Sequence, residues 1–303
     1  MTDLQEAPDD IAGHVEAALR SDAAVRAAGV TLRELARHDE LEAVSRLYDT
    51  IWHPDPSKPL MTTELLRALS KSGNYVTGAY DGDELVGASV AFFGAPRDGC
   101  LYSHIAGVSA RMRGHNVGYV LKLHQRAWAL QHGASTICWT FDPLVRRNAY
   151  FNLVKLAASP AEYLPDFYGG MHDAINGGDE SDRLLVRWDL TAPRVVAASA
   201  GHGTLFDVAA ERAAGAAVAL DVSQAGRPVS GPRDAETLLV SVPSDIEALR
   251  TQDPQAAKDW RQALREVLGG LLDDGARVTG FDRAGWYLLA RGHDTDQPQE
   301  DNR

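Results

Sequence analysis

The sequence predicts an α/β (α+β) fold in which a domain with a central sheet is followed by a smaller domain. Between residues 30 and 190, extended apolar segments are interspersed with segments whose apolar residues recur at helical spacing. After residue 233 the chain shows a strand, a long amphipathic helix and two more strands. These observations indicate two regions, each with apolar residues for a core of its own.

The composition limits the class of protein and its partners. The 303 residues suffice for two domains, and 45% hydrophobic with 24% charged residues is typical of a globular protein. A net charge of -12 argues against binding to nucleic acid or anionic membranes. No apolar run is long enough to span a membrane, and the acidic N-terminus is unlike a signal peptide. The two cysteines, Cys100 and Cys138, are interpreted as isolated core residues in a reducing compartment, so we expect a cytoplasmic protein.

The first third of the chain contains helices and a hairpin. Helical spacing between 12 and 28 predicts an N-terminal helical extension over residues 1–29. Prolines after His53 end a helix, and an Asp-Gly-Asp turn joins two strands. The elements expected as far as residue 93 are a strand at 30–35, helices at 40–52 and 62–71, and strands at 75–80 and 85–93.

A strand, a turn and a helix follow between Gly99 and Gln131. The extended run 101–108 is half apolar, and the helical period begins at Val117. The side chains expected on the solvent-facing side of this helix are Lys122, Gln125 and Arg126. Because a helix start leaves amide groups without partners and is electropositive, the turn at 113–118 fits a pyrophosphate group.

The remaining elements complete a domain expected over residues 30–190 and begin another. Residues 191–232, rich in Ala, Gly and Pro, are expected to be a linker with some local structure. Residues 233–303 are expected to form a small α+β domain with a disordered tail, and they favour a packing or homodimerisation module over a second active site. The expected elements are a strand at 134–141, a helix at 146–158, a strand at 184–190, a strand at 238–242, a helix that begins at Pro254, and strands at 278–281 and 286–289.

The turn carries a resemblance to a known family. Arg113-x-x-Asn116-x-Gly118, placed between a strand and a helix, resembles the acyl-CoA-binding motif Gln/Arg-x-x-Gly-x-Gly/Ala of the GNAT acyltransferase superfamily. Asn116 stands in place of the middle glycine. The expected order β-α-α-β-β-β-α-β-α-β is similar to the GNAT order over about residues 30–190. The resemblance implies a GNAT fold, with a mixed central sheet splayed between its fourth and fifth strands, here 101–108 and 135–141.

The resemblance also implies a co-substrate. Acetyl-CoA or another acyl-CoA, succinyl-CoA included, would bind without a metal. Backbone groups of the fourth strand would hold the pantetheine, and amides of the turn would hold the pyrophosphate. The cofactor-binding residues implied in this way are Ala106, Val108, Arg113, Gly114, His115, Asn116, Val117, Gly118, Tyr119 and Asn148.

Two residues are candidates for proton transfer. An amine attacks only when it is neutral, and His104 on the central strand has the ordinary pKa of a base near neutrality. The alternative is a core histidine bonded to a backbone carbonyl. Many GNAT enzymes place a tyrosine acid on the helix after the fifth strand, where this chain has Leu153. Tyr150 is the nearby candidate, with a core residue as its alternative.

Aromatic, amide and guanidinium groups follow the fifth strand and predict an acceptor site. The signatures Trp-Thr-Phe-Asp-Pro and Arg-Asn-Ala-Tyr-Phe-Asn resemble a subfamily of larger GNAT-like proteins that includes amino-acid N-acyltransferases and N-succinyltransferases. Arg146 or Arg147 would bind a carboxylate, with a solvent-facing helix residue as the alternative. The substrate-binding residues predicted are Trp139, Asp142, Arg146 and Asn152.

The function expected from the resemblance is N-acyl transfer from acyl-CoA to a small, carboxylate-bearing amine such as an amino acid. The departures at Asn116 and Leu153 leave two alternatives open. One is a non-catalytic acyl-CoA-binding protein that acts through its C-terminal domain. The other is a purely structural protein of two domains.

Overall fold

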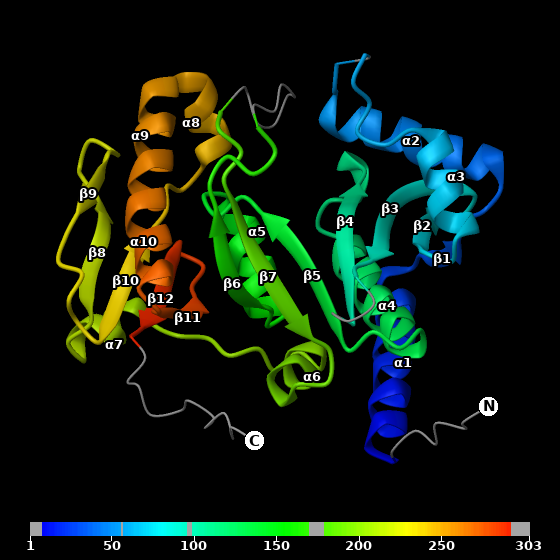
Figure 1. Ribbon diagram of the computed structural model, residues 1–303, viewed down its shortest axis with the longest axis horizontal. Coiled ribbons are helices and arrows are strands. Elements are labelled where there is room, and N and C mark those ends of the chain that lie inside the picture. Colours follow the sequence, from blue (N-terminus) through cyan, green and yellow to red (C-terminus); the bar gives the residue numbers. More distant parts are fainter. Residues whose placement is uncertain (1–7, 56, 96–98, 170–178, 292–303) are drawn as a thin grey trace, which may run out of the picture. The chain divides into compact units, whose positions relative to one another are not determined.

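The computed structural model describes residues 8–55, 57–95, 99–169 and 179–291 (Figure 1). The chain forms two compact units. The described residues of the first unit are 8–55, 57–95, 99–139 and 187–203, and those of the second are 140–169, 179–186 and 204–291. Within the described residues, no helix combines the length and the apolar character that a membrane span requires.

The first unit is built on a mixed sheet. Strands β1 to β4 pair antiparallel in sequence order, and β4 pairs with β5 in parallel. The complete strand order is β1-β2-β3-β4-β5-β7-β6, in which β5 and β7 pass from one unit into the other. The elements are α1 (Pro8–Ala28), β1 (Thr31–Glu34), α2 (His38–Trp52), α3 (Thr63–Lys71), β2 (Tyr75–Asp81), β3 (Glu84–Phe93), β4 (Cys100–Val108), α4 (Val117–Gln131), β5 (Thr136–Phe141), β7 (Arg183–Asp189) and α6 (Pro193–Ser199).

Helices cover both faces of this sheet (Figure 1). On one face, Leu41 and Tyr48 of α2 pack with Val90 of β3 in a cluster that also takes in α3. On the other face, Leu121 of α4 packs with Val86. The α2 helix lies so close to β4 that a Cβ atom at Gly107 would be 2.7 Å from the Trp52 ring. The sheet is therefore held between two apolar layers.

The prediction that one side of α4 faces solvent is wrong. Lys122, Gln125 and Arg126 are all buried, with Arg126 fully so. The α1 helix packs along α4, and the guanidinium of Arg126 donates to Glu16 Oε2 of α1 at 2.7 Å. Its Nε donates to the carbonyl of Leu190 at 2.9 Å. Arg126 is thus covered by α1. Lys122 and Gln125 instead face the sheet, where they donate to Ser103 and Ser89 respectively.

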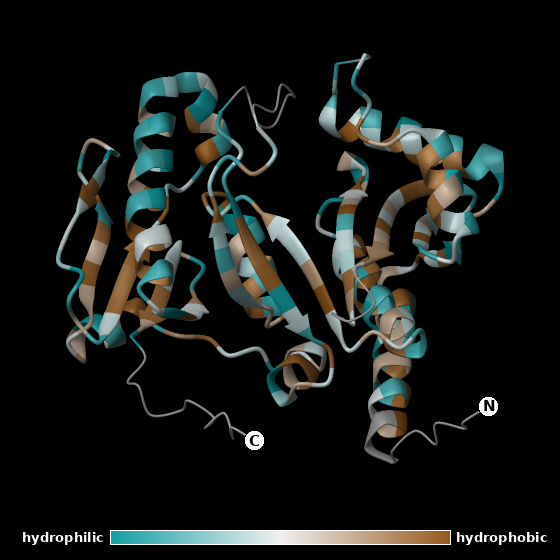
Figure 2. Cartoon of the chain, in the orientation of Figure 1, coloured by the Kyte–Doolittle hydropathy of each residue, from teal (hydrophilic) through white to brown (hydrophobic). Residues whose placement is uncertain are grey.

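The second unit contains a five-stranded sheet in the order β11-β12-β10-β8-β9. Strands β10 and β8 are parallel, and the other neighbours are antiparallel. Figure 2 shows largely hydrophobic colouring on β10 and hydrophilic residues along the visible face of α9. The elements are α5 (Arg146–Tyr150), a π-helix (Phe151–Lys155), β6 (Ser159–Leu164), α7 (Val208–Ala213), β8 (Ala217–Val222), β9 (Pro228–Ser230), β10 (Thr237–Ser241), α8 (Ile246–Gln252), α9 (Pro254–Leu264), a second π-helix (Arg265–Gly269), α10 (Gly270–Asp273), β11 (Arg277–Phe281) and β12 (Trp286–Ala290).

The observed elements differ from the expected ones in several places, and helix α8 is one element that was not expected from the sequence. Strand β6 was not expected, and the helix expected over 146–158 changes from α to π at Phe151. Residues 191–232, expected as a linker, contribute β8 and β9 to the second sheet. The tail expected to be disordered lies, from residue 292 on, outside the described residues.

Candidate functional site

The turn before α4 has the backbone geometry that its motif requires. A short 3-10 helix (Ala110–Met112) is followed by Gly114 with φ +86° and by Asn116 with φ 59° and ψ 15°. Left-handed backbone is costly for most residues but is tolerated by asparagine. Asn116 can therefore replace the glycine of the motif without a change in the path of the chain.

The amide groups of this turn fall into two sets. Those of Arg113 and His115 donate within the turn, to Ala110 O and Met112 O at 3.2 Å each, and that of Tyr119 donates to Asn116 O at 2.9 Å. These three amides, expected to bind a ligand, are already in use. A second set, Gly114, Val117 and Gly118, donates no hydrogen bond to a described residue.

The amides of Gly114, Val117 and Gly118 are suited to bind an anion. They stand at the electropositive start of a 15-residue helix. A Cβ added at Gly118 would meet only Val108, at 3.8 Å, so packing does not demand glycine there. A side chain longer than a methyl group would instead extend into the space beside the amides.

Cationic side chains flank the same turn. Arg111 is held by Asp81 and Glu84, at 3.1 Å from each. Arg113 and His115 are exposed and form no ion pair with a described residue. The guanidinium of Arg113 is therefore available to a bound anion.

Strand β4 leaves part of one edge without a strand partner. It pairs with β3 as far as Val108, whereas its pairing with β5 comprises Cys100↔Thr136, Leu101↔Ile137 and Tyr102↔Cys138. Among the described residues, no strand pairs with the β5 side of β4 after Tyr102. Ala106 and Val108, both expected to bind the cofactor, belong to this segment, and Ala106 is exposed.

His104 occupies a β-bulge in the same segment. The register changes from Ala91↔Ser103 to Val90↔Ile105, which leaves His104 as the extra residue of β4. Its ring is exposed, lies 5.9 Å from the Phe92 ring, and forms no hydrogen bond with a described residue. Partial burial against its surroundings lowers the pKa of His104. The core histidine considered as the alternative is not what the structure contains.

A buried lysine lies beneath this part of the sheet. Lys122 Nζ donates to Ser103 Oγ at 2.9 Å and to Gln125 Oε1 at 3.2 Å, and it lies 3.8 Å from the centre of the Trp139 ring. Burial lowers the pKa of Lys122 to about 7. Trp139, expected to bind substrate, is itself buried and packs edge to face on Trp188 at 5.8 Å.

In the second unit, Asp142 belongs to a buried ion network. Arg261 donates to both of its oxygens at 2.8 Å, and Arg250 donates to Oδ2 at 2.6 Å. The same arginines contact Asp179 at 3.1 and 3.3 Å. Burial opposes ionisation, but the arginine charges outweigh it and hold the pKa of Asp142 well below its usual range. Asp142, predicted to bind substrate, has both oxygens engaged within the protein.

The other predicted residues of the second unit lie on α5 and the π-helix after it. Arg147 pairs with Glu247, whereas Arg146 donates to Ala284 O at 3.3 Å and forms no ion pair with a described residue. Asn148 and Tyr150 are half-buried, and Arg283 lies 5.0 Å from the Tyr150 ring centre. Asn152 is buried. Of the two arginines, Arg146 is therefore the one with donors to spare.

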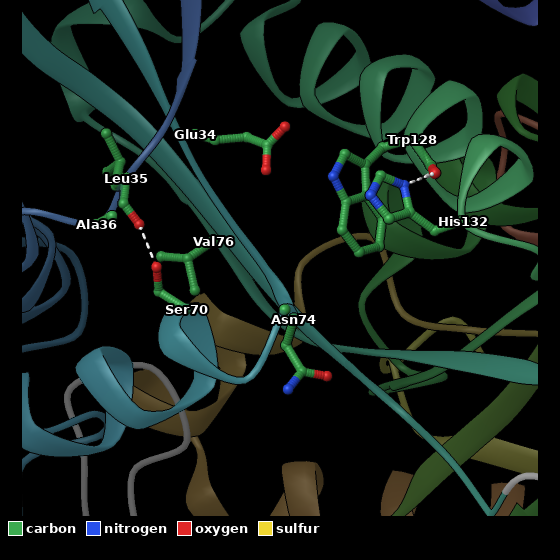
Figure 3. Close-up of a pocket in the computed structure, with 9 residues that line it drawn as sticks. Glu34, Leu35, Ala36, Ser70, Asn74, Val76, Trp128 and His132 are labelled. Atoms are coloured by element: carbon green, nitrogen blue, oxygen red, sulfur yellow. Dashed lines mark hydrogen bonds between the residues drawn. The ribbon is translucent and has the colours of Figure 1, made fainter.

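The first unit also has a pocket of about 240 Å³ at the far end of α4 (Figure 3). The rings of Trp128 and His132 stack on its wall at 3.8 Å, and His132 Nδ1 donates to Trp128 O at 2.8 Å. None of the predicted site residues lines it. Its lining residues are Glu34, Leu35, Ala36, Ser70, Gly73, Asn74, Val76, Trp128 and His132. In the described part of the chain, no group of three or more His, Cys, Asp or Glu residues is placed to hold a metal ion.

Comparisons with known proteins concern the fold. No protein-family model and no curated protein matches the sequence. Among solved structures, an N-acetyltransferase from Staphylococcus aureus is similar at 15% identity and a TM-score of 0.45, over 53% of this chain and 98% of that one. The ribosomal-protein-S18-alanine N-acetyltransferase from Escherichia coli is similar at 10% identity and a TM-score of 0.42, over 54% and 95%.

A third similar structure is yncA from Salmonella typhimurium, which contains its cofactor acetyl-CoA. It is 13% identical, with a TM-score of 0.44 over 54% of this chain and 94% of that one. The chain's own elements confirm the predicted fold class, an α/β fold with a mixed central sheet in which β4 and β5 pair at three positions. Their order is the one that the GNAT resemblance implies, with β6 as an additional strand.

Replacing Lys122 tests the buried lysine. The unfolded chain has an ordinary lysine pKa of about 10.4, so the folded protein binds fewer protons between pH 7 and about 10. The free energy of unfolding should therefore rise with pH, by at most about 1.4 kcal/mol per unit. Lys122→Met should lack this rise. Urea unfolding at pH 7 and pH 9 measures this rise, with the exposed Lys71→Met as the control. If the free energy of unfolding changed equally with pH in the wild type and in Lys122→Met, the lowered pKa of Lys122 would be contradicted.

Replacing Asp142 tests the ion network. Asp142→Asn removes one of the two carboxylates that neutralise Arg250 and Arg261, and it leaves them with Asp179. The expected loss is about 3–5 kcal/mol in the free energy of unfolding, because breaking a buried pair leaves uncompensated charge. Denaturant unfolding measures it, with the exposed Asp234→Asn as the matched control. Equal stability of the two variants would show that the network does not hold this region.

Proposed function

From the GNAT fold as the premise, we propose that this chain is an acyl-CoA-dependent N-acyltransferase. It moves an acetyl or succinyl group from CoA to the amine of a small, carboxylate-bearing acceptor such as an amino acid. The observation that carries the proposal is that the amides of Gly114, Val117 and Gly118, at the start of α4, donate no hydrogen bond to a described residue. The free edge of β4 and the exposed His104 on it support the same function.

The residues present fit an acyl-CoA. The three amides would hold the pyrophosphate, and Arg113 would add a charge-assisted contact. Backbone groups near Ala106 and Val108 would hold the pantetheine, because the β4 edge there has no strand partner among the described residues. Asn116 sets the path of the turn, and Asn148 stays a cofactor-binding residue that the resemblance implies.

The chemistry needs few parts from the protein. The co-substrate supplies an acyl group on a thioester, which an uncharged amine attacks. A backbone amide of β4 would polarise the thioester oxygen. His104 would take the amine proton, directly or through one water, because its lowered pKa keeps the ring neutral near pH 7. Tyr150 remains the proposed acid, although a thiolate leaves readily without one.

Arg146 is the residue proposed to hold the acceptor carboxylate, or that of a succinyl group. It has guanidinium donors beyond its bond to Ala284 O, whereas Arg147 is engaged by Glu247. Three further residues, Trp139, Asn152 and Asp142, remain predicted from the sequence to bind substrate. Their burial assigns them a supporting role in preference to contact with substrate.

The direct test follows thiol release from acetyl-CoA and succinyl-CoA with a panel of amino acids. Two variants of one position sharpen it. Gly118→Glu should leave the melting temperature unchanged or higher, because a carboxylate suits the first turn of a helix. It should weaken acyl-CoA binding at least tenfold by repulsion of the pyrophosphate.

Gly118→Ala is the matched control, because its Cβ meets only Val108 at 3.8 Å, and it should retain binding. Calorimetric titration with acetyl-CoA distinguishes the outcomes. Equal affinity of both variants would place the pyrophosphate elsewhere. Binding without thiol release for any amine would favour the non-catalytic alternative.

A pH profile tests His104. A base must be deprotonated to act, so kcat/KM should decrease at acid pH. The apparent pKa of that decrease, the acid limb of the profile, should lie below the ordinary histidine pKa of about 6.5. His104→Gln should lower kcat/KM by about 10²-fold and remove that limb. The exposed His202→Gln should change neither. An unchanged limb in His104→Gln would assign the base to another group.

A further inference from the structure

The two cysteines of the chain lie side by side. Cys100 begins β4 and Cys138 lies in β5, and the neighbouring pairs Cys100↔Thr136 and Tyr102↔Cys138 place them diagonally across two parallel strands. Their sulfur atoms are 2.6 Å apart. The interpretation as isolated core residues is therefore wrong. With two cysteines in the whole sequence, neither sulfur has another intramolecular partner for a disulfide.

The two thiols differ in environment. Cys138 is buried, and the thiol of Cys100 donates to its sulfur. This hydrogen bond, together with the charge of Arg187, lowers the pKa of Cys138 to about 7 against the effect of burial. The hydrogen bond and burial raise the pKa of Cys100, which is half-buried. Near neutrality Cys138 thus has thiolate character, and Cys100 keeps its proton.

We propose that Cys100 and Cys138 form a redox modification site in which a hydroperoxide converts the two thiols into an intramolecular disulfide. The Cys138 thiolate attacks a peroxide oxygen, the O–O bond breaks, and a sulfenic acid and hydroxide form. Cys100 then attacks the Cys138 sulfur, the S–S bond forms, and the hydroxyl group leaves with the proton of Cys100 as water. In total, two thiols and hydrogen peroxide give one disulfide and two waters.

The position of the pair favours the second step. A disulfide needs sulfur atoms about 2.05 Å apart and backbones within reach of each other, and the three paired positions of these strands begin at Cys100 and end at Cys138. The bond would close a loop between residues 38 positions apart and join β4 to β5 where their pairing ends. The inference does not depend on acyl transfer.

The test uses the full-length wild-type protein with hydrogen peroxide, catalase to stop the reaction, and a thiol count under denaturing conditions. Free thiols should fall from two to none, with a mass loss of about 2 Da and no dimer on a non-reducing gel. Dithiothreitol should restore both thiols. The oxidised protein should melt several degrees higher than the reduced one, because the disulfide restricts the unfolded chain.

Two variants separate the roles. Cys100→Ser should stop at a sulfenic acid on Cys138, which dimedone traps. Cys138→Ser should keep an unreacted thiol at the same peroxide concentration. Two intact thiols in oxidised wild type, a gain of oxygen mass without loss of hydrogen, or a disulfide between chains would each overturn the proposal. The wild-type measurement stands even where a variant folds poorly.

Discussion

The constraint on which the rest of the first unit depends is the unequal pairing of β4. One edge is paired with β3 from Leu101 to Val108 except at the His104 bulge, and the other is paired with β5 over three residues. Backbone groups require partners, so a strand released from its neighbour in the middle of a sheet presents donors and acceptors to whatever lies beside it. The bulge at His104 falls within the released segment and turns an extra side chain outward. The turn before α4 then follows directly from the end of this strand.

Burial of α4 explains much of the chemistry in this unit. The helix lies between the sheet and α1, so its polar residues are enclosed in spite of a wet side in the sequence pattern. Arg126 is compensated by Glu16, but Lys122 has a hydroxyl, an amide oxygen and an aromatic face in place of a carboxylate. Removing a charge from water without an opposite charge is costly, which is why this lysine loses its proton readily.

The sequence predicted local structure well and distant contacts poorly. The helix from Val117 has its expected bounds, because a strong period and the turn before it agree, and the glycine-like conformation at Asn116 follows from the motif. The burial of Arg126 was missed because its partner Glu16 lies 110 positions earlier. Lys122 is enclosed by Ser103 and Trp139, which belong to two strands of the sheet. The partners of Asp142 come from positions 250 and 261, and Cys138 meets a residue 38 positions away. No local pattern encodes such contacts. The roles given to the site residues stay predictions.

The division of the chain into two units has a consequence for the evolution of its gene. The polypeptide leaves the first unit after Trp139, returns by Arg187 and leaves again after Gly203. Asp142 and Asp179 are neutralised by arginines of α8 and α9, so a fragment that stopped before those helices would keep two buried carboxylates without counter-charges. The C-terminal third therefore belongs to the same unit as residues 140–169, and it is not an appendage that truncation could remove.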